Sequence, residues 1–288
     1  MILIDLSQMI LGNLLAQVTP KKDKPAPPPL DENLVRHTTL NVLRTYIGQF
    51  KKEYGEVVIC CDNKHYWRKD YFPNYKSTRK KARSKSELDW NMIFTTINTI
   101  KQELKENFPY KVLDIYGAEA DDIIGILVET YSQTQKIMIV SSDKDFLQLQ
   151  RYGTNVSQYS PITKKKMVSI VPMLDLKEKI IRGDKNDGIP NILSPDDCFI
   201  IEGNRQASLM TDRFNYFLNE NVDDWDDEEA KRNYSRNRTL IDLRCTPEDI
   251  QEEILEAYRT TKTASRSVMF EYFVDKQLTN LMDVINEF

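Results

Sequence analysis

The 288-residue sequence has few of the residues that build covalent or zinc-binding sites. Its four cysteines, at positions 60, 61, 198 and 245, show no CxxC spacing, and His37 and His65 are the two histidines. Structural and catalytic zinc sites depend on such cysteine and histidine groups, so the sequence does not predict one. Scattered free cysteines are typical of a protein that stays in a reducing cytoplasm.

Long hydrophobic runs are also absent. The apolar start MILIDLSQMILGNLL is interrupted by Asp5, has no basic leader before it, and is too short to span a bilayer. We therefore expect it to begin with a buried strand and expect no contact with a membrane. Because 40% of the residues are hydrophobic and 29% are charged, the chain can bury a full core as one large or two smaller domains.

The segment 111–146 predicts a strand, a helix and a second strand. The runs Val112 to Ile115 and Ile137 to Val140 have strand length and β-branched residues. Between them, one apolar stripe at helical spacing consists of Ile123, Ile124, Leu127, Val128 and Tyr131. This order is typical of a parallel sheet with helices packed on its faces.

Two earlier runs, Met1 to Ile4 and Val57 to Cys61, also predict buried strands, with a helix over 34–54 between them. From residue 204 onward the patterns are helical, at 209–218, 230–236, 246–258 and 268–288. We therefore predict the α/β class, with a central, mostly parallel sheet flanked by helices and a C-terminal helical subdomain. The expected division is a core over 1–183 and a helical part over 184–288.

Acidic residues follow all four predicted strands. They are Asp5, Asp62, Glu119, Asp121, Asp122, Asp143 and Asp145. Since the carboxyl ends of parallel strands share one edge of a sheet, these side chains should converge there. Crowded carboxylates repel one another unless a cation lies among them, and oxygen ligands favour Mg²⁺ or Mn²⁺. The simpler alternative is that Asp121 and Asp122 cap a helix and that Asp143 and Asp145 are loop acids.

The segment 64–85 has the opposite charge. It contains nine basic residues and one acid, with Tyr66, Trp67, Tyr71, Phe72 and Tyr75 among them. A charged run is often only a solvated face. However, cations that neutralise phosphates beside rings that stack on bases are typical of a groove for single-stranded nucleic acid. A basic segment next to an acidic metal site suggests a phosphodiesterase.

A third acidic group stands in the turn GDKND, which contains Asp184 and Asp187. A spacing of three allows both side chains to face one direction. Taken alone, such a turn is more often a structural feature in which the acids bond to nearby backbone amides.

In their order and spacing, the motifs LIDLSQ, CCDN, YWRKD, YFPNYKSTRKK, EADD, SSDKDF and GDKNDGIP resemble the flap endonuclease family of 5′ nucleases, and its phage members most closely. The resemblance implies a PIN-like 5′ nuclease core that uses two Mg²⁺ ions, for which Mn²⁺ can substitute. It implies that one ion is surrounded by Asp5, Asp62, Glu119, Asp121, Asp122 and Asp143. It places Asp145, Asp184 and Asp187 around the second.

The resemblance also implies roles in catalysis and in binding nucleic acid. The catalytic set would be Asp5, Asp62, Asp121, Asp143 and Asp145 with Arg68 and Lys76. The nucleic-acid contacts would be Arg68, Lys69, Tyr75, Lys76, Arg79, Lys80, Lys81 and Arg83. In this assignment Arg68 and Lys76 hold the phosphate, and the ring of Tyr75 stacks on the terminal base. Residues 64–85 would form a clamp around the 5′ strand.

The implied activity is 5′ to 3′ exonuclease, flap endonuclease and ribonuclease H activity on RNA–DNA hybrids and on duplex or flapped DNA with a 5′ end. Such an enzyme, acting as a monomer in the cytoplasm of an infected bacterial cell, would remove RNA primers and adjacent DNA from lagging-strand fragments during phage replication. Two alternatives remain from the residues alone. They are a PIN-type single-strand ribonuclease and a non-catalytic nucleic-acid-binding scaffold.

One segment departs from the family pattern. Where cellular members continue into a glycine-rich hairpin that grips duplex DNA, this chain reads NILSPDDCFIIEGNRQ. We expect Asp196 and Asp197 to repel phosphate there. If the protein binds duplex DNA weakly, it needs a partner that keeps it on the DNA. We therefore expect a single-stranded-DNA-binding protein or a sliding clamp to dock on the C-terminal helices, over 268–288.

Overall fold

The computed structural model describes residues 1–18, 31–84, 86 and 88–288. A sheet of six strands in the order β3-β2-β1-β4-β5-β6 forms its centre. The strands are β1 (Ile2–Asp5), β2 (Val57–Cys60), β3 (Lys111–Leu113), β4 (Ile137–Val140), β5 (Val156–Ser160) and β6 (Lys165–Met167). All neighbours are parallel except β5 and β6. The predicted α/β class and mostly parallel sheet are confirmed.

Strand β1 shows how the sequence supplies both faces of the sheet. Successive side chains of a strand point to opposite faces. Accordingly Ile2 and Ile4 belong to one apolar cluster, whereas Met1 and Leu3 belong to the other. All four are fully buried, which explains why the strand is apolar throughout instead of alternating.

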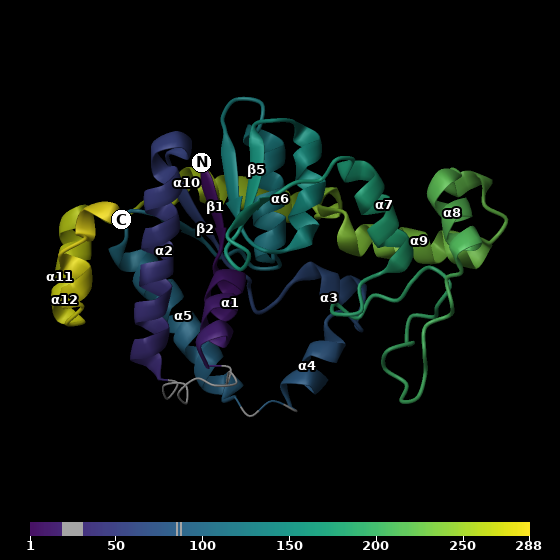
Figure 1. The fold of residues 1–288 in the computed structure, drawn as a ribbon, viewed down its shortest axis with the longest axis horizontal. Coiled ribbons are helices and arrows are strands. Elements are labelled where there is room, and N and C mark those ends of the chain that lie inside the picture. Colours follow the sequence, from purple (N-terminus) through teal and green to yellow (C-terminus); the bar gives the residue numbers. More distant parts are fainter. Residues whose placement is uncertain (19–30, 85, 87) are drawn as a thin grey trace.

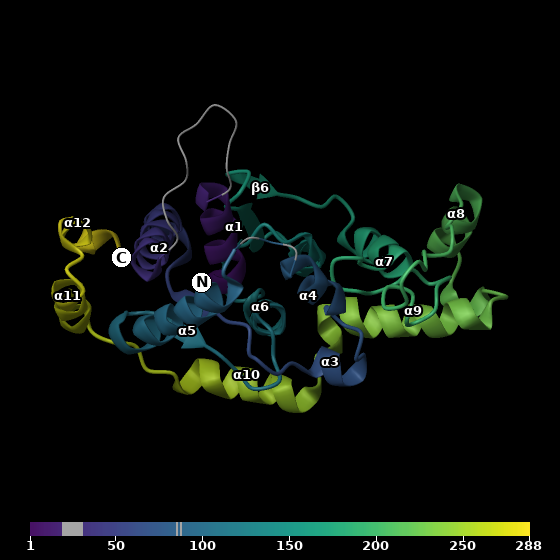
Figure 2. The same ribbon diagram turned by 90° about the horizontal axis from the view of Figure 1, so that it is seen from below.

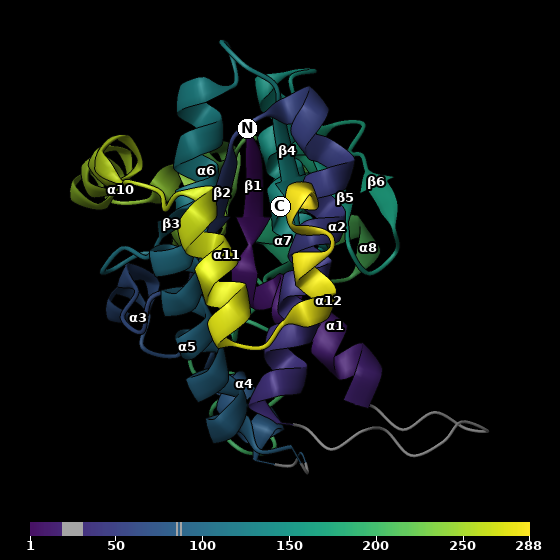
Figure 3. The same cartoon turned by 90° about the vertical axis from the view of Figure 1, so that its left-hand side faces the viewer.

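Three helices cover the first face: α1 (Leu6–Val18), α2 (Glu32–Tyr54) and α5 (Trp90–Asn107). The Asp31 and Asp89 side chains cap α2 and α5 by accepting hydrogen bonds from backbone amides in the first helical turn. The C-terminal helices α11 (Arg266–Asp275) and α12 (Thr279–Met282) lie against this layer, as Figure 3 shows. Phe288, the last residue, is fully buried in the same cluster.

The second face is covered by α6 (Ala120–Tyr131) and α10 (Glu248–Thr260), together with the 3₁₀ helix Lys144–Tyr152. The apolar stripe predicted for residues 123–131 is the face of α6 that packs on the sheet. Close packing between α6 and the 3₁₀ turn Leu243–Cys245 depends on Gly125, where an added Cβ would lie 3.1 Å from the Cβ of Leu243.

The remaining helices extend from one end of the sheet: α3 (Trp67–Tyr71), α4 (Ser77–Arg83), α7 (Pro172–Arg182), α8 (Thr211–Asn219) and α9 (Glu228–Ile241). Seen from below in Figure 2, α3 and α4 stand beside α7 and α9. Short 3₁₀ turns occur at Val222–Asp224, Leu243–Cys245 and Ile285–Glu287. No helix in the described ranges is long and apolar enough to cross a membrane.

Residues beyond 246 return to the sheet. Helix α10 contributes Ile250, Ile254 and Tyr258 to the cluster on one face, and α11 contributes Met269 and Phe273 to the cluster on the other. The predicted division into a core over 1–183 and a helical subdomain over 184–288 stays a prediction. In the packing, α7 to α9 are the part that stands apart from the sheet, and α10 to α12 help to bury it.

Candidate active site

The acids that follow β1, β2 and β4 lie at one edge of the sheet, the edge from which α1 leaves in Figure 1. Asp5 is the last residue of β1 and is 5% exposed. Asp62 accepts a hydrogen bond from the backbone amide of Ala120, at 3.0 Å, and so ties the loop after β2 to the start of α6. The strand ends therefore bring these acids together, as the parallel order requires.

Local hydrogen bonds fix the acids that follow β4. The Ser141 hydroxyl donates to the Asp5 carboxylate at 3.3 Å and accepts from the Asp143 amide at 3.1 Å. Asp143 in turn accepts from the amide of Asp145 at 2.9 Å, which begins the following 3₁₀ helix. The sequence did not single out Ser141, although its position directly before the acids is a usable signal.

Burial and mutual repulsion make this edge costly to ionise. Loss of water and the nearby Asp62 and Asp143 raise the pKa of Asp5 to about 7. Burial and Asp143 also raise the pKa of Asp121 well above its ordinary value. Such shifts are common where several carboxylates share a site, and a bound cation would relieve them.

Lys179 of α7 contacts two of the predicted site acids, although the sequence alone did not point to it. Its ammonium group forms ion pairs with Asp145 and, at 3.0 Å, with Asp184. Two acids from separate elements thus already share one positive charge. The signal in the sequence is weak, because Lys179 is simply a basic residue in the last turn of a helix, where cations also favour the helix dipole.

Lys76 brings a second cation to the acids. Its ammonium lies 2.5 Å from a Glu119 carboxylate oxygen and between the rings of Tyr66 and Tyr75, at 5.6 and 5.0 Å from their centroids. Although burial favours the neutral amine, Glu119 and Asp187 raise the pKa of Lys76 above its ordinary value. The backbone of Lys76 has a φ of 56°, and its amide donates to the Asp187 carbonyl at 2.7 Å. A non-glycine residue held in this region is strained, which often marks a functional position.

Arg68 and Asp122 lie in the interior of the protein. This position does not fit the phosphate contact predicted for Arg68 or a direct contact between Asp122 and a metal ion. The Arg68 guanidinium is 2% exposed and bonds to Glu119 at 3.0 Å and to Asp122 at 2.9 Å. Asp122 also accepts from Trp67, Thr246 and the Glu119 amide, so both of its oxygens are occupied. The capping alternative therefore describes Asp122, and Arg68 acts as its counter-charge.

Tyr75 is also buried, at 3% exposed, which corrects the prediction that its ring stacks on a terminal base. The ring packs edge-on against Tyr66, with centroids 5.8 Å apart, and its hydroxyl donates to Glu119 at 3.2 Å. It belongs to an apolar cluster with Phe72, Ile180 and Leu240. In this position Tyr75 orients an acid and supports Lys76.

The turn after α7 is built on glycine. Gly183 has a φ of 69°, and an added Cβ would lie 2.4 Å from the Ile189 carbonyl oxygen, so no other residue fits. Asp184 accepts from the amide of Asn186 at 2.8 Å, as in the structural alternative. The turn also presents Asp184 to Lys179 and Asp187 to Arg79. The functional interpretation of these two acids stays a prediction.

The rest of the predicted clamp is more open. Lys69 is exposed, and the Arg79 side chain is 42% exposed while it pairs with Asp187. Arg83 lies over the ring of Phe94, 4.6 Å from its centroid. The side chains of Lys80 and Lys81 lie outside the described residues, so their role stays a prediction.

The structure corrects the expected effect of Asp196. This acid accepts hydrogen bonds from both Arg232 and Arg236 of α9, the former at 2.8 Å. Its negative charge is thus balanced by two cations and does not oppose a phosphate as a free acid would. Asp197 is exposed, and for this residue the expected repulsion stays a prediction.

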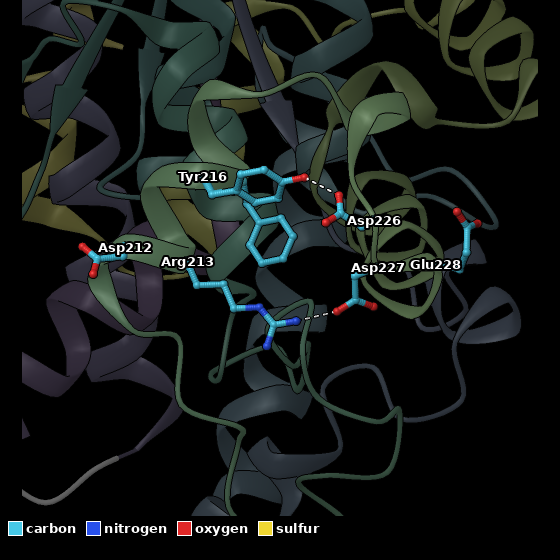
Figure 4. A pocket seen from close by; sticks show the side chains of 7 residues that line it. Asp212, Arg213, Tyr216, Asp226, Asp227 and Glu228 are labelled. Carbon is cyan, nitrogen blue, oxygen red and sulfur yellow. Dashed lines mark hydrogen bonds and ion pairs between the residues drawn. The ribbon is translucent and has the colours of Figure 1, made fainter.

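A separate hollow lies between α8 and the start of α9, far along the chain from the sheet edge (Figure 4). Arg213 pairs there with Asp227, and Tyr216 donates to Asp226 at 2.9 Å. With Asp212 and Glu228 also in its lining, the hollow carries more negative than positive charge. It is unsuited to a phosphate backbone, and the sheet edge remains the candidate active site.

Comparison with known proteins identifies the family. Residues 2–180 match the family model described as 5′-3′ exonuclease, N-terminal resolvase-like domain, and residues 171–288 match the model described as T4 RNase H, C terminal. The chain is 36% identical to "Ribonuclease H" of Enterobacteria phage T4, over 99% of this chain and 95% of that protein. The chain belongs to the 5′-3′ exonuclease family. The predicted family resemblance is thereby confirmed.

Other relatives of this 5′-3′ exonuclease family member cover smaller parts or are more distant. A "5′-3′ exonuclease" of Buchnera aphidicola subsp. Schizaphis graminum is 30% identical over 52% of this chain and 53% of its own. A phage T5 5′-exonuclease with bound divalent zinc ions has a TM-score of 0.63 at 16% identity, over 91% of this chain and 99% of that one. A T5 D15 flap endonuclease in a pseudo-enzyme-product complex with DNA and metal ions has a TM-score of 0.61 at 16% identity, over 90% and 99%. These two structures support the fold.

Proposed function

We propose that this nuclease is a Mg²⁺-dependent, two-metal phosphodiesterase with 5′ to 3′ exonuclease, flap endonuclease and ribonuclease H activity. In this proposal it removes RNA primers and adjacent DNA from lagging-strand fragments during phage replication in an infected bacterial cell. The observation that carries the proposal is the group of acids around the buried Asp5, with Lys76 and Lys179 beside it. The similarity to phage T4 "Ribonuclease H" along nearly the whole chain supports the substrate class.

The residues at the edge have the right chemistry for divalent cations. The donors are carboxylate oxygens, which suit Mg²⁺ and Mn²⁺, and Asp5 and Asp121 have raised pKa values that a cation would lower again. Asp145 and Asp184 both pair with the Lys179 ammonium, so the two acids lie close enough to contact one cation. This arrangement supports a second metal site. Within the described ranges, no three such side chains already form a complete group of ligands, so binding would draw them closer.

We assign the first ion to Asp5, Asp62, Glu119, Asp121 and Asp143, and the second to Asp145, Asp184 and Asp187. Asp122 is left out, because Arg68, Trp67 and Thr246 already bond to its oxygens, and it becomes a positioning residue. Glu119 also has both oxygens bonded, to Lys76, Arg68 and Tyr75, so we place it near the first ion through a water molecule and not as a direct ligand. When bound, such ions polarise a phosphodiester and lower the pKa of a water that attacks it.

The protein's own side chains would hold the strand in place for this reaction. Lys76 is positioned to neutralise the scissile phosphate, because its charge is kept by Glu119 and Asp187 and its backbone is fixed to the turn at Asp187. Arg79, paired with the same acid but half exposed, can contact the neighbouring phosphate. Arg68 acts through Glu119, whose carboxylate it orients.

One experiment separates this proposal from its alternatives. A 5′-labelled RNA-primed duplex and a 5′-flap duplex are incubated with Mg²⁺ and, in parallel, with a chelator. Short 5′ products that require Mg²⁺ support the proposal. Internal cuts confined to single strands would instead indicate a PIN-type ribonuclease, and binding without any cleavage would indicate a scaffold.

We also propose that a single-stranded-DNA-binding protein or a sliding clamp tethers the enzyme through its C-terminal helices. Deleting residues 268–288 is a poor test, because Met269, Phe273 and Phe288 are fully buried in the main core. A double change of Phe270 and Val274 to serine is better, since these side chains of α11 are 47% and 48% exposed. We expect it to abolish stimulation by the partner and to leave Mg²⁺-dependent cleavage unchanged.

A further inference from the structure

The loops after β2 and β3 are joined backbone to backbone at the acidic edge. The amide of Asn63 donates to the Ala118 carbonyl at 3.1 Å, and the amide of Gly117 donates to the His65 carbonyl at 3.1 Å. The amide of Trp67 then donates to the Gly117 carbonyl at 2.9 Å. The same loops carry Asp62 and Glu119. Other side chains on these loops are therefore held in a fixed position relative to those two acids.

These joined loops display two rings to solvent. Tyr116 is 67% exposed and His65 is also exposed, and their ring centroids are 5.5 Å apart with planes inclined by 38°. The turn that holds Tyr116 requires glycine next to it, because Gly117 has a φ of 84° and an added Cβ would lie 3.1 Å from Ile250. Single exposed apolar groups are common, but a fixed and exposed aromatic pair beside an active site is not explained by packing.

The position of this pair fits nucleic acid better than a protein partner. Tyr116 is three residues from Glu119, so their Cα atoms are at most about 11 Å apart. At about 3.4 Å per nucleotide along a strand, this distance corresponds to only a few nucleotides from a phosphate at the acids. The exposed Lys64 next to His65 adds a cation that can neutralise the adjoining phosphate.

We propose that Tyr116, supported by His65, is a stacking platform for an unpaired base of the substrate strand. This inference rests on the proposed nuclease function and adds a base-binding subsite to it. Two of the clamp tyrosines do not provide one, because Tyr75 is buried at 3% exposed and Tyr66 is packed against it. The third, Tyr71, is 49% exposed but lines a separate hollow with Asp196 and Arg232. Aromatic stacking accepts any base, since every base has a π-face, so the platform would hold the strand without reading its sequence.

The test uses full-length protein and a 5′-flap duplex with 2-aminopurine placed at one position at a time through the single-stranded arm and junction. Binding is measured in chelator, so that the strand stays intact. We expect the wild type to quench the fluorescence at one or two adjacent positions. Tyr116→Ala should remove that quenching and weaken binding by about 5- to 150-fold, the range for loss of one stacked base.

Three variants make the result specific. Tyr116→Phe keeps the ring and should retain the quenching, and His65→Ala should reduce it partly. Tyr216→Ala removes a ring of 37% exposure on α8, which lies away from the acidic edge in Figure 1, and should change neither quenching nor affinity. The slope of log affinity against log salt should stay the same in Tyr116→Ala, because no phosphate contact is lost.

The proposal is overturned if the wild type quenches no position, or if Tyr116→Ala retains quenching and binds within twofold of the wild type. Cleavage of the same duplex by the wild type in Mg²⁺ is measured separately. Absence of that cleavage would contradict the nuclease function, whereas cleavage together with unchanged quenching in Tyr116→Ala would contradict the platform alone.

Discussion

The Lys179 ammonium joins Asp145, which follows β4, to Asp184, which follows α7. Burial raises the pKa of Asp145 to about 6, and Lys179 opposes that rise while Asp143 adds to it. Lys179 therefore occupies the region between two acids that we assign to one metal ion. A divalent ion bound at this proposed site would compete with the lysine for the same oxygens.

Replacing Lys179 with methionine should strengthen metal binding. The change removes the competing charge and keeps the length of the side chain, so affinity for Mn²⁺ should rise about tenfold or more, in line with the effect of one nearby charge on a carboxylate. Calorimetric titration with Mn²⁺ measures it. Lys166→Met, on the exposed face of β6, serves as the control, and equal or weaker binding by Lys179→Met would contradict the assignment.

Asp143→Asn should separate catalysis from binding. The change keeps the side-chain volume but removes one negative ligand, so cleavage should fall by orders of magnitude while substrate binding stays equal or tightens. Asp145→Asn and Asp187→Asn should resemble each other, because both acids serve the second ion in our assignment. Near-native turnover by Asp143→Asn would contradict the two-ion arrangement. So would normal cleavage by one of the variants Asp145→Asn and Asp187→Asn when the other is inactive.

Arg68 and Lys76 should fail in different ways when each is changed to alanine. Loss of Arg68 leaves Asp122 buried without its counter-charge and Glu119 with Lys76 alone, and we expect unfolding to become easier by about 3 to 5 kcal/mol. Loss of Lys76 should instead lower the slope of log affinity against log salt by about one unit, because one phosphate contact disappears. Chemical denaturation measures the loss of stability in Arg68→Ala, and substrate binding at several salt concentrations measures the change of slope in Lys76→Ala. An unchanged slope in Lys76→Ala would remove this residue from the phosphate site.

A pH-dependent contribution to stability should come from Glu103 of α5, which holds α2 and α11 together. It accepts from Arg36 at 2.8 Å and from Tyr272 at 2.9 Å, and Lys276 lies 2.9 Å away. Although burial acts in the opposite direction, these partners lower the pKa of Glu103 below its ordinary value of 4.5. Its ionised form is therefore favoured in the folded state.

Because the folded pKa is lowered, this stabilisation is present above pH 4.5 and is lost as the pH falls toward the folded value. Glu103→Gln should cost about 1 to 3 kcal/mol at neutral pH, since it leaves the buried Arg36 with Glu32 as its remaining acid partner. The difference from the wild type should shrink below pH 4.5 in denaturation curves. A difference that is constant down to pH 3 would show that the charge of Glu103 contributes nothing.

Much of the sheet was predictable because its information is local. Fully apolar runs of four residues, such as Ile137 to Val140, are typical of strands buried on both faces, and the acids that follow them must meet at one edge when the strands are parallel. The helix caps at Asp31 and Asp89 are also local, since each bonds within three residues.

The sequence by itself therefore determined the α/β class, the acidic edge and the family. Only the tertiary structure decided which charges face solvent. Arg68 is buried because the carbonyl of Leu240, 172 residues away, accepts its Nε–H at 2.9 Å, and Phe288 is buried because α11 carries the chain end back to the first face of the sheet. Periodicity predicts that a segment has an apolar side. It cannot predict which distant segment covers it, because burial depends on contacts that form only when the whole chain has folded.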